Sequence, residues 1–138
     1  MIWKAPSFAE LLPLFPEPYD VSQEVLKAGM NRIVNVRKAF ELMSLPDCKG
    51  EVVIGVEDPF FPINSGNYRI SWDNGNRLVE RCKAEPDIIC SVQALSQLLT
   101  GFASIEALNV AGTVSINDKG DILSSIFRPK KLFINDYF

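Results

Sequence analysis

The 138-residue sequence contains no histidine. This absence excludes a Ser-His-Asp or Cys-His nucleophile system and an imidazole metal site, and it removes the side chain whose unperturbed charge changes near neutral pH. Any catalytic base must therefore be another group. The chain also lacks a run of 18 apolar residues and a cationic N-terminal region followed by a long apolar segment. We therefore expect a soluble, cytoplasmic protein.

Cysteines and blocks of basic residues are also scarce. The three cysteines, Cys48, Cys82 and Cys90, are odd in number and lack CxxC spacing. We therefore expect no structural zinc and no disulfide framework, but three semi-buried small apolar side chains in a reducing compartment. The 14 basic and 17 acidic residues give a net charge of −3, and no run of five lysines or arginines occurs. Nucleic acid and membrane surfaces are therefore not expected as partners.

The apolar content is sufficient for one globular domain. Apolar residues make up 47% of the chain and charged residues 22%, and a chain of this size buries roughly 68–70% of its unfolded surface. Seven of the nine prolines precede residue 63, and four of them lie in the first 18 residues. We therefore predict an irregular lead-in over residues 1–28 and a regular domain over residues 29–138.

Alternating apolar residues predict the strands of this domain. Residues 51–57 and 68–72 have the period of two that is typical of half-buried strands. Between residues 72 and 77 the Asn74-Gly75 pair predicts a tight hairpin, because both residues readily adopt positive φ angles. The returning strand is predicted at 77–83, and shorter strands at 32–36, 87–90 and 113–116.

Helical spacing and stop signals predict the helices. One helix is expected at 37–45, ended by Pro46, and a second at 92–100, ended by Gly101. Ser104 is predicted to cap a third, in which Ile105, Leu108 and Ala111 face inward, and Asp118 to cap a fourth that extends to Phe127. Strands in a hairpin-rich meander followed by clustered helices predict an α+β fold, with a largely antiparallel sheet of about five strands and helices packed on one face.

No motif for phosphate binding or nucleophilic catalysis occurs, because GxGxxG, P-loop, GxSxG and HExxH patterns are all absent. Glu57 and Asp58 follow each other at a strand end, where neighbouring side chains point to opposite faces. A solvated strand terminus is therefore favoured over a catalytic carboxylate pair. Core or interface packing is likewise favoured over a ligand pocket for the aromatic residues Phe60, Phe61, Tyr68 and Trp72.

The last six residues contain three aromatic side chains, at Phe133, Tyr137 and Phe138. A terminus packed by aromatic rings would hold its α-carboxylate in a fixed, partly desolvated place. The unperturbed pKa of that group is about 3.3–3.7, and desolvation would raise this pKa toward a value suited to proton abstraction. Phe138 is thus a candidate base in a chain without histidine. The residues of the C-terminal segment alone favour the simpler interpretation, that Phe138 ends an edge strand.

Three stretches together resemble the C-terminal domain of Eis-type acetyltransferases, the enhanced intracellular survival family. They are GMNRIVNV at 29–36 followed by a helix, VEDP at 56–59 with NSGNY at 64–68, and FRP at 127–129 with the ending NDYF at 135–138. The LxxLxxG pattern at 95–101 also fits. The resemblance covers residues 29–138, and it would span the whole chain if residues 1–28 are the end of a preceding GNAT domain.

The resemblance implies a sterol-carrier-protein-like domain that follows two GNAT domains in an acetyl-CoA-dependent N-acetyltransferase. Acetyl-CoA would bind the first GNAT domain, so we expect no cofactor in this chain and no activity from the chain alone. The resemblance implies that the Phe138 carboxylate is the catalytic base, and we expect Tyr137 and Asp136 to contact the substrate. The partners would be the GNAT domains of the same polypeptide, an amine-bearing small molecule or lysine, and further copies in a homo-oligomer.

Two other functions compete with this interpretation. A stand-alone sterol or acyl-lipid carrier would require a continuous apolar cavity, for which Leu98, Leu99, Phe102 and Ile126 are the expected lining. A structural or oligomerisation module would require exposed anchor residues, for which Phe60, Phe61 and Trp72 are the candidates. The exposure of these side chains in the folded domain discriminates between the alternatives.

Overall fold

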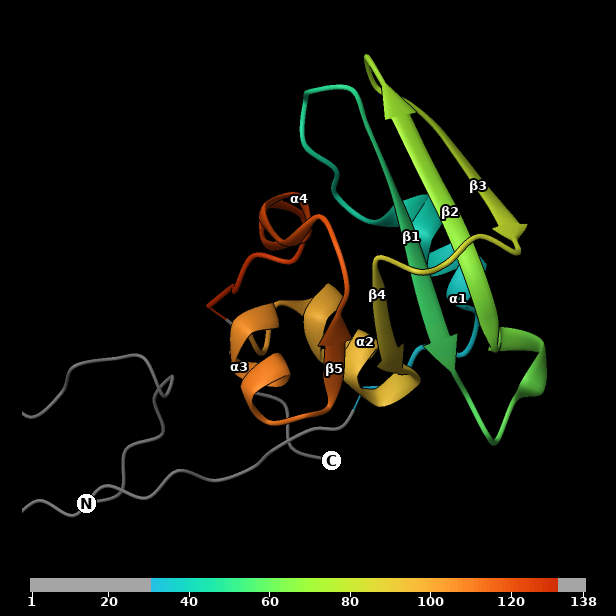
Figure 1. The fold of residues 1–138 in the computed structure, drawn as a ribbon, viewed down its shortest axis with the longest axis vertical. Coiled ribbons are helices and arrows are strands. Elements are labelled where there is room, and N and C mark those ends of the chain that lie inside the picture. Colours follow the sequence, from blue (N-terminus) through green and yellow to red (C-terminus); the bar gives the residue numbers. More distant parts are fainter. Residues whose placement is uncertain (1–30, 132–138) are drawn as a thin grey trace, which may run out of the picture. The chain divides into compact units, whose positions relative to one another are not determined.

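Within residues 31–131, which the computed structural model describes, five strands form one sheet in the order β3-β2-β1-β4-β5 (Figure 1). Neighbouring strands are antiparallel except β1 and β4, which are parallel. The α+β class and the largely antiparallel sheet are therefore confirmed. The strands are β1 (Gly50–Glu57), β2 (Gly66–Asp73), β3 (Asn76–Cys82), β4 (Ile88–Ser91) and β5 (Val114–Ile116).

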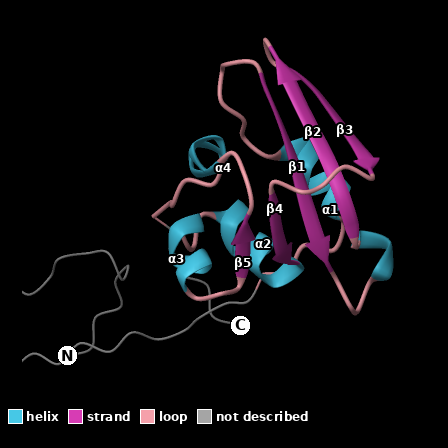
Figure 2. Cartoon of the chain, viewed as in Figure 1, coloured by secondary structure: helices cyan, strands magenta, loops and turns pink. Residues whose placement is uncertain are grey.

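Among the described residues, four helices and one short 3₁₀ turn accompany these strands (Figure 2). Helix α1 precedes the sheet and contacts β3, whereas α2 follows β4 directly and α3 precedes β5. None of the helices among the described residues is long and apolar enough to cross a bilayer. The elements are α1 (Val36–Leu42), η3 (Pro62–Asn64), α2 (Val92–Thr100), α3 (Ile105–Val110) and α4 (Gly120–Ile126).

The core lies on the sheet face that presents Tyr68, Ile70 and Trp72 of β2, because these alternate with half-exposed neighbours. Phe40 of α1 packs edge-on against Tyr68, with the ring centroids 5.4 Å apart. Leu95 of α2 is fully buried in the same cluster. The period-two pattern at 68–72 thus corresponds to one buried face. The half-buried strand predicted at 51–57 is wrong, because residues 52–56 of β1 are all buried. Burial of each large apolar side chain contributes about 1.5–3 kcal/mol relative to exposure.

Local signals set the ends of several elements as the sequence predicts. Asn74 and Gly75 have φ values of 48° and 82° and form the β2–β3 turn. The Ser104 side chain accepts a hydrogen bond from the amide of Ala107 and caps α3. Gly101 ends α2 in the left-handed conformation, with φ at 76°, which glycine adopts without steric cost.

The predicted strand at 32–36 is wrong, because this segment has no regular structure and Val36 already begins α1. Its backbone groups bond to side chains instead of to a neighbouring strand. The amide of Ile33 donates to Ser96 Oγ at 3.1 Å, and the carbonyl of Val34 accepts from Asn64 Nδ2 at 3.2 Å. The Asn35 side chain then caps α1 by accepting from the amide of Lys38.

Helix α1 also ends earlier than predicted, at Leu42. The Arg77 guanidinium Nη1 donates to the carbonyl oxygens of Phe40, Glu41 and Met43 at 3.3, 3.0 and 2.5 Å. These carbonyls belong to the last turn and lack partners within the helix, so a cation there is favourable. A long-range contact from β3 therefore stabilises the end of this helix.

Two predictions near the C-terminal helices are wrong in detail. Ala111 is exposed and does not face the core, because α3 ends at Val110. Lys119 stands at the N-cap of α4, whereas the Asp118 carboxylate accepts a hydrogen bond from the Lys119 amide. Residues 1–28 and the site candidates Asp136, Tyr137 and Phe138 lie outside the described residues.

Candidate functional site

A buried polar cluster lies where β1 ends, and Asp58 is at its centre. Asp58 is 1% exposed as a residue, and its side chain is fully buried. Its Oδ1 accepts hydrogen bonds from Arg32 Nη2 at 2.5 Å and from the amides of Phe60 and Phe61 at 3.1 and 3.0 Å. Its Oδ2 accepts from Asn64 Nδ2 at 2.9 Å. Both carboxylate oxygens therefore accept hydrogen bonds.

These contacts decide the charge of Asp58. Burial alone would raise its pKa, but hydrogen bonds from Asn64 and the Phe61 amide, together with the Arg32 guanidinium, outweigh burial and lower the pKa below its usual value. Asp58 is thus an ionised structural carboxylate rather than a base. Glu57 is exposed, as expected, but the expectation of a solvated terminus is wrong for Asp58.

Asn64 connects this cluster to α1. Its side chain is buried, its Oδ1 accepts from the amide of Val36 at 3.3 Å, and its Nδ2 also donates to the carbonyl of Val34. Tyr68 OH donates to the carbonyl of Asn64 at 2.9 Å and accepts from Arg81 Nη2 at 3.0 Å. The NSGNY segment therefore connects, through polar contacts, the start of α1, the end of β1 and β3.

The cluster supports an exposed apolar surface, which we name the aromatic loop patch. It consists of Val34, Phe60, Phe61 and Ile63, whose residues are 72%, 74%, 49% and 80% exposed. The Arg32 guanidinium carbon lies 5.4 and 5.3 Å from the ring centres of Phe60 and Phe61, within the range of a cation–π contact.

The aromatic residues singled out in the sequence thus divide into two pairs. Tyr68 and Trp72 are core residues, at 2% and 5% exposure. Phe60 and Phe61 are exposed, so two of the three anchors expected for an interaction module are available on the surface and Trp72 is not.

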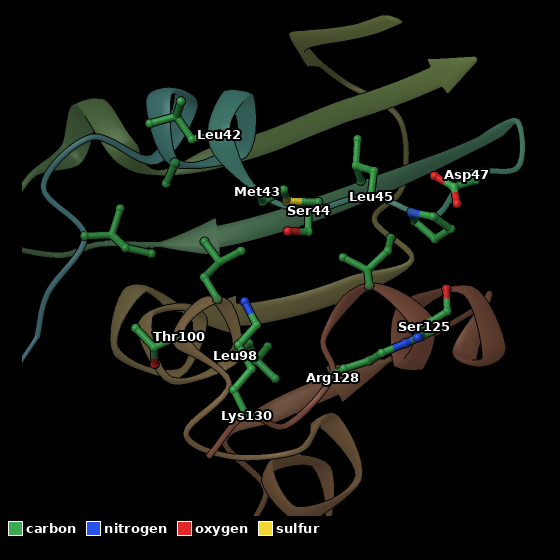
Figure 3. A pocket seen from close by; sticks show the side chains of 15 residues that line it. Leu42, Met43, Ser44, Leu45, Asp47, Leu98, Thr100, Ser125, Arg128 and Lys130 are labelled. Atoms are coloured by element: carbon green, nitrogen blue, oxygen red, sulfur yellow. The ribbon is translucent and has the colours of Figure 1, made fainter. Parts of the chain in front are cut away.

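An apolar groove of about 560 Å³ lies between α1, α2 and the segment that follows α4 (Figure 3). Of the four side chains predicted to line a lipid cavity, Leu98, Leu99 and Ile126 line this groove, whereas Phe102 does not and is 71% exposed. Arg128 and Lys130 add two cationic groups to the lining. Ile33, Leu42, Met43 and Leu45 contribute further apolar surface.

The cysteines and carboxylates of the described region offer little chemistry. Residues 31–131 contain no group of three or more metal-ligating side chains close enough to bind a metal. Cys90 is buried and its Sγ lies 3.7 Å from the carbonyl oxygen of Gly55. Burial, with a smaller contribution from Glu57, raises the pKa of the Cys90 thiol to about 12. Cys48, in contrast with its predicted semi-buried position, is exposed.

Sequence reasoning did not find the roles of Arg32, Asn64 and Arg77. The sequence does contain a signal for the turn at Asp58, because aspartate commonly forms turns by accepting hydrogen bonds from backbone amides that follow it. The partners that make Asp58 a buried centre are 6 and 26 residues away. No local pattern encodes contacts of this kind.

The family model described as a sterol carrier protein domain matches residues 36–134. No curated protein matches the chain significantly. Several solved structures resemble it. The chain is 30% identical to Eis1 from Mycobacterium abscessus, with a TM-score of 0.63 over 78% of this chain and 27% of that protein.

A probable N-acyltransferase from Enterococcus faecalis is 25% identical, with a TM-score of 0.74 over 90% of this chain and 32% of its own length. A GCN5-related N-acetyltransferase from Anabaena variabilis is also 25% identical, with a TM-score of 0.62 over 72% of this chain and 26% of its own. The chain therefore spans a third or less of the length of these relatives.

Proposed function

This chain belongs to the sterol carrier protein domain family, and we propose that it is the C-terminal domain of an Eis-like, acetyl-CoA-dependent N-acetyltransferase. The observation that carries the proposal is the 30% identity to Eis1 over 78% of the chain, at a TM-score of 0.63. The other relatives are likewise described as an N-acetyltransferase and a probable N-acyltransferase. Each is more than three times as long as the segment it shares with this chain, which leaves room for separate acetyltransferase domains.

The proposed contribution of this domain is the carboxylate at the end of the chain. A substrate ammonium with a pKa near 10 must lose its proton before its nitrogen attacks a thioester, so an anion within hydrogen-bond reach has a definite task. The α-carboxylate of Phe138 is the proposed base, and Tyr137 and Asp136 are the proposed contacts to the substrate. The sequence contains no histidine that would compete for this role.

The described part of the domain supports this role through the place where the tail begins. The amide of Lys130 donates to the carbonyl of Gly101 at 2.8 Å, which ties the chain after α4 to the end of α2. From this anchor the eight residues to Phe138 span at most roughly 26–29 Å when extended. This length is the farthest that the terminal carboxylate can lie from the anchor.

Acetyl-CoA would be held by the acetyltransferase portion of the enzyme. The chain has no glycine-rich phosphate loop, since its eight glycines are scattered singly. The fit of the cofactor to this chain is therefore poor. The expected partners are the GNAT domains of the same polypeptide and an amine-bearing small molecule or lysine side chain, with further copies in a homo-oligomer.

The experiment that tests the proposal alters only the chain terminus. Adding three alanines after Phe138 in the full-length enzyme moves the carboxylate away from its place, so turnover should fall strongly while acetyl-CoA binding, measured by calorimetry, is unchanged. Adding the same residues at the N-terminus is the control. Unchanged turnover with the extended C-terminus would refute the proposed base.

The groove favours a second function, that of a sterol or acyl-lipid carrier. Three of the four predicted lining residues border a space of about 560 Å³, and clefts of about 300–1,000 Å³ are the usual size of small-molecule sites. Arg128 and Lys130 would suit an anionic head group. Extraction of the purified chain followed by mass spectrometry tests this function, and a chain free of lipid that also fails to bind a fluorescent fatty acid would exclude it.

A further inference from the structure

We infer that the aromatic loop patch of Val34, Phe60, Phe61 and Ile63 is the surface on which this domain docks against the acetyltransferase portion of its enzyme. The inference rests on the proposed function, because that function supplies the partner. It adds a docking surface to the proposed function. This surface is separate from the terminal carboxylate and can be tested without it.

The loop that carries Phe60 and Phe61 is held in place by hydrogen bonds while their rings stay exposed. The Asp58 carboxylate holds the amides of both Phe60 and Phe61, and the Arg32 guanidinium lies against both rings. The Val34 carbonyl is bonded to the Asn64 side chain. The loop that carries the patch is thus held by hydrogen bonds to the buried side chains of Asp58 and Asn64. Large exposed apolar side chains of this kind are a feature of interaction sites, and a preorganised loop loses little entropy on docking.

The position of the patch along the chain indicates which partner covers it. Arg32 and Val34 are among the first four described residues, where the polypeptide enters the domain from its N-terminal side. In the solved relatives more than two thirds of the polypeptide lies outside the part that matches this chain. If that portion precedes the domain, as proposed, it is joined in sequence to the segment that carries Val34. A preceding domain is therefore favoured over a second copy of this chain as the occupant.

The side chains of the patch indicate what the partner's surface must offer. Two phenyl rings require an apolar recess, and aromatic anchors of this kind dominate the energy of many interfaces. Arg32 is neutralised by Asp58 at 2.5 Å. Arg81 lies at the border, where its Nη2 donates to the carbonyl of Ile63, and no carboxylate within residues 31–131 forms an ion pair with it. We therefore expect an apolar recess with an acidic residue placed toward Arg81.

Hydroxyl-radical footprinting compares the accessibility of these rings in two proteins, the 138-residue chain and the full-length enzyme. Phe60 and Phe61 should be oxidised several-fold more slowly in the enzyme than in the chain. Phe102 is the matched reference, because it is an exposed phenylalanine outside the patch, and its oxidation should not change. Equal oxidation of Phe60 and Phe61 in the two proteins would overturn the inference.

Variants test the same surface independently. In the full-length enzyme the double substitution Phe60→Ser and Phe61→Ser should increase cleavage by trypsin between the domains several-fold, whereas Phe102→Ser should leave it unchanged. Protection of the two rings in the chain alone that increases with its concentration would identify a second copy as the occupant and would also overturn the inference.

The outcome is separable from that of the proposed function. If the C-terminal extension abolishes turnover but Phe60 and Phe61 stay exposed in the enzyme, the docking surface is wrong and the terminal base stands. If the rings are protected but the extension has no effect, the base is wrong and the surface stands. A reading frame that encodes no acetyltransferase domain would overturn both.

Discussion

Arg32 Nη2 and Asp58 Oδ1 lie 2.5 Å apart although 26 residues separate them in sequence, and the Asp58 side chain is completely shielded from solvent. The pair joins the segment that leads into α1 to the end of β1. The same carboxylate holds the loop that carries Phe60 and Phe61. The ionised Asp58 therefore holds both the segment before α1 and the loop proposed for docking.

Replacing Asp58 by alanine should lower the melting temperature of the chain by roughly 5–10 °C, because the Phe60, Phe61 and Asn64 donors and the Arg32 charge lose their acceptor. Glu57→Ala is the matched control, since Glu57 is the adjacent carboxylate and is exposed. Thermal unfolding followed by circular dichroism measures both variants. Equal melting temperatures for the two would contradict the structural role of Asp58.

The same carboxylate makes stability depend on pH. Its pKa is lowered in the folded chain, so the unfolded chain binds more protons wherever pH lies between the two pKa values, and stability there rises with pH. The contribution is complete above the unfolded pKa of about 3.9 and is lost as pH falls below it through the folded pKa.

The pH dependence is measured as a difference between wild type and Asp58→Asn in urea unfolding. The advantage of the wild type should be constant at pH values well above about 4 and should shrink as pH falls below it. The subtraction removes the contribution of Glu106, whose pKa is also lowered, chiefly by a hydrogen bond from Ser124. A difference that does not change with pH would show that folding does not lower the pKa of Asp58.

The sequence predicts those parts of the fold that depend on near neighbours. The Asn74-Gly75 turn and the Gly101 stop require only their own backbone conformations, and the alternation in β2 records one buried face. The apolar residues at 32–36 suit a strand or a loop equally, so their pattern wrongly predicts a strand. What decides between them are bonds to Ser96 and Asn64, 63 and 30 residues away.

The candidate site was less accessible to sequence reasoning than the fold. The exposure of Phe60 and Phe61 depends on Asp58 being buried, and that depends on Arg32 and Asn64 arriving from other parts of the chain. The sequence shows Asp58 beside Glu57 at a strand end and contains no local sign that Asp58 is buried. The predicted roles of Asp136, Tyr137 and Phe138 rest on the resemblance and stay predictions.

The three cysteines should react at very different rates. Cys48 is exposed, Cys82 half-buried and Cys90 buried, with the pKa of its thiol raised to about 12. Because the thiolate is the reactive form, a thiol reagent at about pH 8 should label Cys48 first and Cys90 only after denaturation. Cys48→Ser should remove the fast phase. Labelling of Cys90 in the native chain, detected by mass spectrometry, would contradict its burial.

Gly101→Ala should destabilise the chain more than Gly112→Ala, although both glycines have nearly the same φ, 76° and 70°. The left-handed conformation costs either alanine about 1 kcal/mol. At Gly112 an added Cβ meets nothing within 4 Å, whereas at Gly101 it would lie 2.8 Å from the Lys130 nitrogen and 2.9 Å from the Arg128 oxygen. Both are backbone atoms, so the chain after α4 must move.

Urea unfolding of the two variants separates the cost of the left-handed backbone, which both share, from the cost of the clash with residues 128–130, which only Gly101→Ala has. We expect Gly101→Ala to lose about 1–3 kcal/mol more than Gly112→Ala, the usual cost of overpacking a well-packed site. Equal losses would show that the 128–130 segment yields freely. Because Lys130 anchors the start of the tail, the same substitution in the full-length enzyme should lower turnover without changing acetyl-CoA binding, whereas Gly112→Ala should leave turnover intact. A tail that needs no fixed starting point would instead tolerate both changes, and the Gly101–Lys130 bond would then serve stability alone.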